Sequence, residues 1–376
     1  MRTAVVIVLL GLGAFAVAAG LVLQLHTYPT LAKVQHNINT VSVSQADGAT
    51  ALVYPPGSPM PEIRHNLNLT ATTHVEGDLA QPEVKEGGDV TVWRRSTIVK
   101  EDRGGLVLSA EVRRICVNRH TGESVSPCHG QFYETEQDKR ITATDNELLQ
   151  PGLNFVFPFD TQQQDYLWYD TVLKQPLFVK YDAEDTVEGL AVYRFAQSVP
   201  STMVTTYAVP GSLVGKPDVP SVDVGQYYSV NRTIWVEPRT GAVLKVREDV
   251  QNELRAAGQA EGHGTFVFDG VLQLNDSSVR ANADQVKANL PQLFLITTLP
   301  RILWISGAVL IVAGLVLLAL WRKGFVWAAL ALVLGAGLAS GITVTATSMN
   351  NPDRELDLKH VVQSGGTETA VDYGVR

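Results

Sequence analysis

The sequence has few charged residues, and its middle region lacks any long apolar run. Charged residues make up 18% of the 376 residues, whereas 45% are hydrophobic. Much of that hydrophobicity lies in three uncharged runs near the two ends, Ala4–Leu23, Ile302–Leu320 and Phe325–Ile342. Each run approaches the roughly 20 residues that a helix needs to cross a bilayer, so a purely soluble protein is excluded. Because residues 24–301 contain no further span, a polytopic transporter is excluded too, and a large domain held at a membrane remains.

The sequence also lacks a basic excess, since its formal net charge is −8. The charges next to the apolar runs on one side are Arg2, Arg322 and Lys323. Lys and Arg accumulate on the cytoplasmic side of membrane helices, so we expect these residues inside and residues 24–301 outside, together with the tail. The exported region is then acidic, which excludes nucleic acid as a partner. We expect a multi-pass protein of the cell membrane whose large domain is extracytoplasmic.

These features predict a division of the chain into five parts. They are a transmembrane helix at 4–23, a β-rich extracytoplasmic domain at 24–298, transmembrane helices at 299–320 and 325–342, and an acidic polar tail at 343–376. A cleaved signal peptide ending near Ala16–Ala18 is the alternative for the first run, and it would export the domain as well.

No catalytic motif is complete in this sequence. The eight histidines include no i, i+4 pair on a predicted helix. The run Gly211–Lys216 resembles a nucleophile elbow and a phosphate loop, but its serine comes one place early for the first and its glycine spacing is one residue short for the second. Asp160, Asp165 and Asp170 are typical of turns rather than of an acid–base set. We therefore expect neither enzymatic activity nor a cofactor.

Both cysteines, Cys116 and Cys128, lie in the exported region, where oxidation is permitted. The residues between them include a turn sequence in which Gly122 can adopt a positive φ. The two cysteines would face each other across a hairpin centred on Gly122, so we predict a disulfide between them. A zinc site that adds His120 and His129 is the alternative, although its spacing matches no common zinc finger.

Between the apolar runs, β-type segments dominate. Residues 67–75 alternate strictly and place Leu67, Leu69 and Val75 on one face. Further runs have lengths and breaks that suit antiparallel meanders: Val90–Val99, Gly105–Val117, Leu190–Val199, Met203–Val209, Tyr227–Val236, Ala242–Val250 and Thr265–Leu274. The clearest hairpin contains Pro238, which can open a type I turn, and Gly241, which can close it. It resembles the turn at Asn118–Gly122.

One helix is predicted before the second apolar run. Val279, Ala283, Val286 and Leu290 have helical spacing and follow a good N-cap region at Asp276–Ser277. The fold class is therefore a membrane-anchored, mainly β protein. Its large antiparallel domain, which we expect in two lobes, lies between an N-terminal transmembrane helix and a C-terminal transmembrane helical hairpin.

Several blocks resemble the actinobacterial PorA family of envelope proteins. They occur in the family order between membrane helices, and they are Tyr28–Val34, Gly152–Asp160, Tyr166–Asp170, Gly189–Phe195, Val209–Gly215 and Trp235–Pro238. The resemblance implies an actinobacterial cell-envelope protein, and the porin label comes with the family name. It implies no catalytic residues. The third apolar run and the acidic tail depart from the family pattern, in which most members end in a basic tail after the second helix.

The porin label conflicts with the apolar runs, which have the length of helices rather than of barrel strands. Two or three helices enclose no aqueous pore unless several chains assemble. A second resemblance, in Gly189–Phe195 and Ile234–Gly241, is to the bacterial lipoprotein-carrier fold, a curved antiparallel sheet that cradles acyl chains. Plain hairpins are the alternative explanation for both segments.

On that fold-level analogy, we rank first an envelope protein whose β domain binds or hands over a lipid or another hydrophobic ligand. An oligomeric, channel-forming porin is the alternative, and a structural or interaction module is the second alternative. The expected partners are membrane lipid, other envelope lipids or other envelope proteins.

The densest aromatic block is where we expect such a ligand to bind. It consists of Phe155, Phe157, Phe159, Tyr166, Trp168 and Tyr169. Alternation along a strand would place the first three rings on one face, with Pro158 marking a sheet edge. Aromatic rings line apolar pockets, but they also fill cores, and both interpretations stay open at this point.

Overall fold

The structure, a computed structural model, describes residues 2–320 except for residues 56, 59, 86–87, 136–139, 143, 145–146 and 148. The expected third span and the acidic tail lie outside the described residues, as do Arg322 and Lys323. The described chain forms two compact units. One unit is residues 27–298, and the other contains the helical residues up to 26 and from 299 onward.

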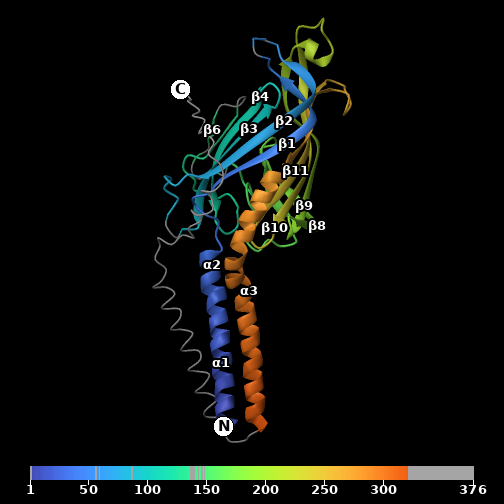
Figure 1. The fold of residues 1–376 in the computed structure, drawn as a ribbon. Coiled ribbons are helices and arrows are strands. Elements are labelled where there is room, and N and C mark those ends of the chain that lie inside the picture. The colour runs from blue at the N-terminus through green and yellow to red at the C-terminus, as the bar shows by residue number, and fades with distance from the viewer. Residues whose placement is uncertain are drawn as a thin grey trace. The chain divides into compact units, whose positions relative to one another are not determined.

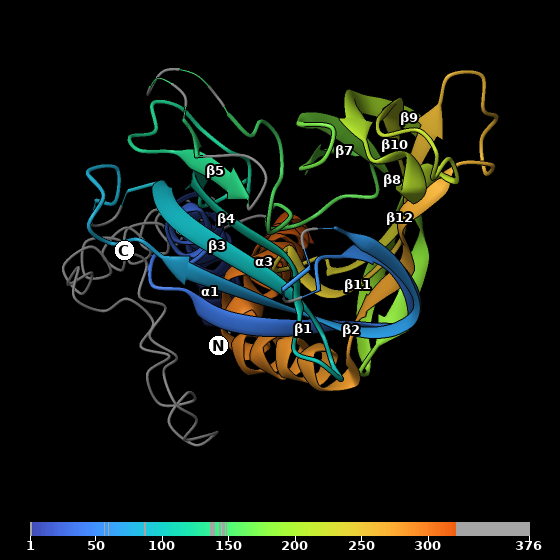
Figure 2. The ribbon, with the colours of Figure 1, turned by 90° about the horizontal axis from the view of Figure 1, so that it is seen from above.

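Residues 27–298 form one antiparallel sheet of twelve strands (Figure 1). The strands are β1 (Asn39–Val53), β2 (Glu62–Gly77), β3 (Val90–Glu101), β4 (Val107–Asn118), β5 (Phe132–Thr135), β6 (Ile141–Thr142), β7 (Tyr166–Asp170), β8 (Gln175–Val187), β9 (Leu190–Val209), β10 (Val222–Glu237), β11 (Ala242–Ala256) and β12 (Thr265–Leu274). Their order is β6-β5-β4-β3-β2-β1-β12-β11-β10-β9-β8-β7, so two meanders meet where β1 pairs with β12. The two edge strands, β6 and β7, are consecutive in the chain. Figure 2 shows that the sheet curls around the start of helix α3 (Asp276–Leu320).

The predicted mainly antiparallel β architecture is confirmed, but its division into two lobes was wrong. All predicted β runs fall in strands of the single sheet, with 105–106 just before β4. The runs Leu190–Val199 and Met203–Val209 form one strand, β9, although Pro200 lies between them. The ladder between β9 and β10 shifts register opposite Pro200, between Tyr228 and Val230. The proline therefore occupies an irregularity where its missing N–H group is tolerated.

Two tight turns in different halves of the sheet have the same form, as the sequence predicts. Gly122 has φ of 72°, and its N–H donates to the carbonyl of Asn118 over 2.9 Å. Gly241 has φ of 70°, and its N–H donates to the carbonyl of Glu237 over 2.9 Å. A left-handed residue at the end of each turn explains why glycine occupies both positions.

Helix α3 begins as predicted, with its cap one residue earlier. The Asn275 side chain accepts a hydrogen bond from the Ser278 N–H over 2.9 Å, so Asn275 acts as the N-cap. Val279, Ala283 and Val286 are buried against Leu244 and other apolar side chains of the sheet. The predicted apolar face of this helix therefore secures the start of α3 to the β domain. The Gly211–Lys216 run contributes a 3-10 turn, η2 (Gly211–Val214), between β9 and β10.

The second unit consists of α1 (Arg2–Val22) and the end of α3, and after α1 the chain continues through a π-helical turn, η1 (Leu23–Thr27), into the short α2 (Tyr28–Leu31). Within this unit the helices approach closely at small residues, because a Cβ added at Gly13 would lie 2.8 Å from the Gly307 carbonyl oxygen. Two helical segments of the described chain are long and apolar enough to cross a membrane, namely Ala4–Leu31 and Thr298–Ala319.

Candidate functional site

Residues 152–161, here called the strap, do not form the strand that we predicted for the aromatic block. Their backbone N–H groups donate to the two tight turns instead of to a ladder. The Phe157 N–H bonds the Gly241 carbonyl over 2.9 Å, and the Phe159 N–H bonds the His120 carbonyl over 3.1 Å. Pro158 supplies no donor. The expectation that three rings share one strand face was therefore wrong, because around Phe157 and Phe159 the strap is held by turns and not by a neighbouring strand.

The rings of the strap are distributed over separate hydrophobic clusters. Phe157 is 0% exposed, and its ring stacks on Phe195 at 4.7 Å and on Trp168 at 5.6 Å between centroids. Tyr166 meets Phe157 edge-on at 5.3 Å. These contacts are those of a packed core, so Phe157 and Tyr166 fill the space under the strap.

The other aromatic candidates lie on either side of that core. Phe155 packs against Trp93 at 5.9 Å, whereas Phe159 lies in another cluster with Tyr28 and Ala32. Tyr169 is buried, and burial raises the pKa of its hydroxyl. Of the six residues proposed from the sequence, Phe155, Trp168 and Tyr169 line a cavity of the β domain.

The strap also connects the two ends of the curved sheet. Leu153 donates to the Leu167 carbonyl over 2.8 Å and accepts from the Tyr169 N–H over 2.9 Å, which attaches it to the edge strand β7. On its other side, Leu153 forms a bridge with Glu123, beside the turn that follows β4. The strap thus joins the two meanders at one end of the domain.

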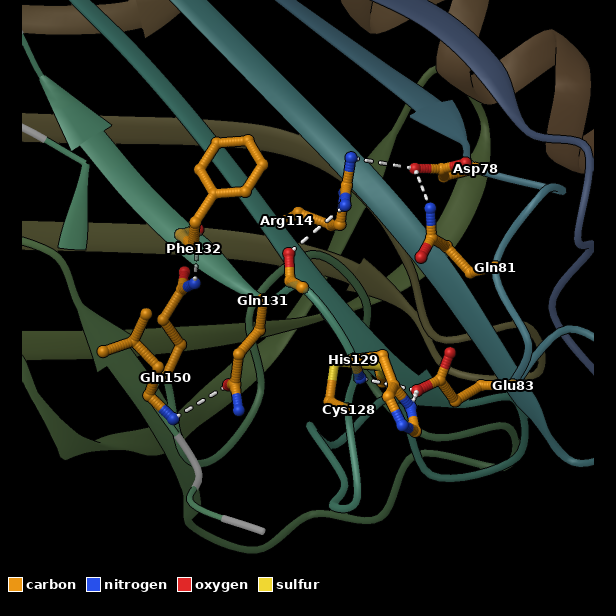
Figure 3. The surroundings of a disulfide bond; sticks show 12 residues. Asp78, Gln81, Glu83, Arg114, Cys128, His129, Gln131, Phe132 and Gln150 are labelled. Carbon is orange, nitrogen blue, oxygen red and sulfur yellow. Dashed lines mark hydrogen bonds and ion pairs between the residues drawn. A yellow bond between two sulfur atoms is a disulfide. The ribbon is translucent and has the colours of Figure 1, made fainter. Parts of the chain in front are cut away.

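The predicted disulfide between Cys116 and Cys128 is present, with Cα atoms 5.6 Å apart (Figure 3). The register differs from our expectation, because Val125, and not Cys128, donates its N–H to the Cys116 carbonyl over 3.0 Å. Both sulfur atoms are in the disulfide and are not free to bind zinc. His129 contacts Glu83 at 2.5 Å. Among the described residues, no group of three or more His, Cys, Asp or Glu side chains is placed to hold a metal ion.

The concave face of the sheet and the start of α3 enclose a cavity of about 520 Å³, here called the chamber. Successive strands contribute hydroxyl side chains to it, namely Thr40, Ser42, Ser44, Thr73, Thr97 and Ser109. From α3, Asn282, Gln285 and Asn289 add amides. The chamber is therefore largely polar on the side formed by β1–β4, whereas apolar side chains such as Val243, Val246 and Val250 line the side formed by β11.

Charged side chains also face the chamber, and among them Arg232 has two carboxylate partners. Its Nε donates to Glu248 Oε1 over 2.5 Å, and it also bonds Gln197 and Asp170. Asp170 is 1% exposed and additionally accepts the Tyr228 hydroxyl over 3.1 Å. Burial disfavours the charge of Arg232, but the two carboxylates outweigh burial and raise its pKa. Arg232 is thus fixed in place by its partners.

Arg113 is the second chamber arginine, and it is held mainly by neutral groups. It donates to Asn154 over 3.0 Å and to Gln150 over 3.3 Å, and its Nε lies 3.3 Å from Glu111. Its guanidinium also covers the Phe155 ring at 4.9 Å. Burial, followed by the positive charge of Arg95, lowers the pKa of Arg113 to about 10.

Arg95 differs from both of these arginines. Its side chain lines the chamber from β3, and its buried Nε has no hydrogen-bond partner. It forms no ion pair within the described part of the chain. We did not predict a role for these arginines from the sequence, although a signal was present. On a strand, Arg95 and Arg113 each face the same side as the residues two places before and after them.

The chain is similar in sequence to a known protein family and to two named proteins. The model of a family described as "Porin PorA" matches residues 5–316. A protein named "Porin PorA" from Corynebacterium resistens is 25% identical over 234 residues, which cover 45% of this chain and 56% of that protein. Another protein of the same name, from Corynebacterium amycolatum, is 22% identical over 278 residues, covering 62% of this chain and 72% of that relative. The chain thus matches little more than half the length of the first of these relatives.

Proposed function

Because this chain belongs to the Porin PorA family, we propose that it is a channel-forming envelope protein whose chamber admits hydrophilic solutes. The family and the two apolar helices indicate a membrane or cell-envelope protein. The polar wall that β1–β4 give the chamber is the observation that carries the proposal beyond that statement. Its hydroxyl, amide and charged groups suit a hydrated solute, in the way that the lumen of a porin is polar.

The chamber favours a hydrophilic solute over the acyl chain that the lipoprotein-carrier resemblance suggested. An acyl chain would remove water from Arg95 and Glu111 without offering them hydrogen bonds, and unpaired buried polar groups are costly. The most buried ring among the candidates, Phe157, is already packed and offers no surface to a ligand. The porin alternative therefore has more support than lipid handover.

Charged residues on the outer face of the sheet support the proposal that the β domain itself does not span the membrane. Residues that alternate with chamber residues carry charge, as Arg94 does on β3 and Lys245 and Arg247 do on β11. A lipid-facing barrel needs an apolar outer band, and an Arg or Lys at the bilayer midplane costs about 2–4 kcal/mol. We propose that helices of several assembled copies cross the membrane together, with the β domain in water.

Conductance in planar bilayers tests this proposal with the purified full-length protein. We expect ion channels, and we expect Arg95→Gln to reduce their preference for anions because it removes a positive charge from the chamber. Arg94→Gln is the matched control, since Arg94 lies next to Arg95 on β3, faces the opposite side of the sheet and pairs with Glu76. Absence of conductance from wild-type protein, at any tested concentration, would overturn the proposal.

A further inference from the structure

Among the described residues that line the chamber, Arg95 is the cation without an ion-pair partner. Arg232 is held by two carboxylates, and Arg113 by Glu111 and two amides. Arg95 has no such partner, yet its Nε is buried. A buried guanidinium donor without an acceptor is costly, and an acceptor supplied by a ligand would remove that cost.

The surroundings of Arg95 show what kind of ligand could supply the acceptor. Arg95 and Arg113 are neighbours across the β3–β4 ladder, where they form a Cα pair. Their positive charges repel each other, and this repulsion is one cause of the lowered pKa of Arg113. An anion beside both guanidinium groups would offset this repulsion, and guanidinium groups bind phosphate oxygens with paired hydrogen bonds.

Two carboxylates, those of Glu111 and Glu248, face the same chamber as the arginines. Glu111 lies beside Arg113, and Glu248 is bonded to Arg232. Burial raises the pKa of Glu248, but Arg232 outweighs burial, and Arg95 and Arg113 add to its effect, so the pKa is lowered. Both carboxylates therefore stay with an arginine that is already paired, and Arg95 is left for a ligand.

The rest of the chamber wall suits a hydroxyl-rich molecule. The six serine and threonine side chains named above come from β1–β4, and Arg95 and Arg113 lie on β3 and β4 of the same wall. Thr73 and Thr97 bond each other through their hydroxyl groups over 3.0 Å, which sets their spacing. Trp93, two residues before Arg95 on the same face of β3, is 1% exposed and packs against Phe155, so it closes the chamber wall beside Arg95. A volume of about 520 Å³ accommodates a mono- or disaccharide.

We propose that the chamber binds the phosphate group of a hydroxyl-rich solute, a sugar phosphate in chemical class, with Arg95 as the group that contacts the phosphate. The inference rests on the proposed function only in using the same chamber, since binding does not require conductance. The solute can be free or can be the headgroup of a glycerophospholipid, because both present the same chemistry to Arg95.

Isothermal titration of the detergent-solubilised full chain tests the site with glucose 1-phosphate as the probe. We expect wild type and Arg94→Gln to bind equally well. Arg95→Gln should weaken binding by about tenfold or more, as the loss of a charge-assisted hydrogen bond implies, and Arg95→Lys should recover part of the affinity. Glucose, which lacks the phosphate group, should not compete with glucose 1-phosphate. A thermal melt of each variant shows that the fold is retained.

A second titration separates the two sources of the phosphate group. If mixed micelles containing phosphatidylinositol displace glucose 1-phosphate, the site also accepts a lipid headgroup; if they do not, its solute is free, and both results support the site. Equal binding by wild type and Arg95→Gln, or no binding by wild type of either probe, would overturn the inference. Binding without conductance would retain the site and remove the channel, whereas conductance without binding would do the reverse.

Discussion

The aromatic cluster under the strap and the chamber beside it are neighbours that share Trp168, yet they are built from opposite chemistry. Around Phe157 the rings are in mutual contact, and Phe157 itself is 0% exposed. On the β1–β4 side of the chamber, hydroxyl groups and two arginines line open space. The comparison teaches that aromatic density marked the core of this domain, whereas small polar residues on alternating strand positions mark its cavity.

Phe157→Ala tests the first half of the comparison and should have the largest effect. Removing a ring that is 0% exposed and stacked on two others should destabilise the β domain by about 3–5 kcal/mol. Chemical denaturation followed by tryptophan fluorescence measures the loss. Phe178→Ala is the control, because Phe178 is 58% exposed and its removal should change stability by no more than about 0.5 kcal/mol. Equal effects of both changes would mean that Phe157 is not part of a core.

Replacing both Cys116 and Cys128 with serine should have the next largest effect. The bond joins residues 12 apart in sequence, and its loss should lower the free energy of unfolding by about 2–4 kcal/mol. Reducing agent should bring wild type to the stability of the double variant. If wild type and variant unfold at the same denaturant concentration without reductant, the bridge does not stabilise the domain.

Gly241→Ala examines the attachment of the strap to its turns. A Cβ there would lie 2.0 Å from the Phe157 carbonyl oxygen, whereas a Cβ at Gly189 meets nothing within 4 Å. Both glycines have positive φ, so both changes lose about 1–2 kcal/mol through the backbone. The overlap should cost Gly241→Ala about 1–3 kcal/mol more. Thermal unfolding compares the two variants, and equal melting temperatures would show that the strap is not tied to this turn.

The smallest expected effect is on pH dependence, and it concerns the chamber. The pKa of Glu248 is lowered from its ordinary value of 4.5 because Arg232 outweighs burial. Its stabilisation is therefore fully present above pH 4.5 and is lost as the pH falls toward the lower pKa of the folded state. Glu248→Gln should flatten this acid limb of a stability–pH curve. Glu261→Gln, in the exposed turn between β11 and β12, should leave it unchanged.

Much of the fold could be predicted from the sequence, because the strands carry β-branched residues and the turns carry Gly122 and Gly241 at positions of positive φ. The disulfide followed from two cysteines near one turn, although its register did not. What local patterns could not provide was the closure of twelve strands into one curved sheet. That closure depends on β1 meeting β12 and on Leu153 bridging distant segments.

The candidate site was harder to predict for the same reason. Thr40, Ser42 and Ser44 form an alternating polar series, which is ordinary on any water-exposed strand. Only the curvature of the sheet turns this face inward, toward Arg95 and Arg113. Residue type alone therefore directed attention to the rings of the strap, and the topology was needed to identify the chamber.

The central claim is that hydrophilic solutes pass through the polar chamber, and a cysteine-block recording tests it most directly. Both native cysteines are bonded to each other, so a cysteine introduced at Ser42, which lines the chamber, is the only reactive thiol. We predict that a charged, water-soluble methanethiosulfonate reagent reduces the single-channel current of Ser42→Cys and leaves that of Val41→Cys unchanged, since Val41 is 58% exposed on the outer face. A current that is insensitive to modification at Ser42 would contradict the account.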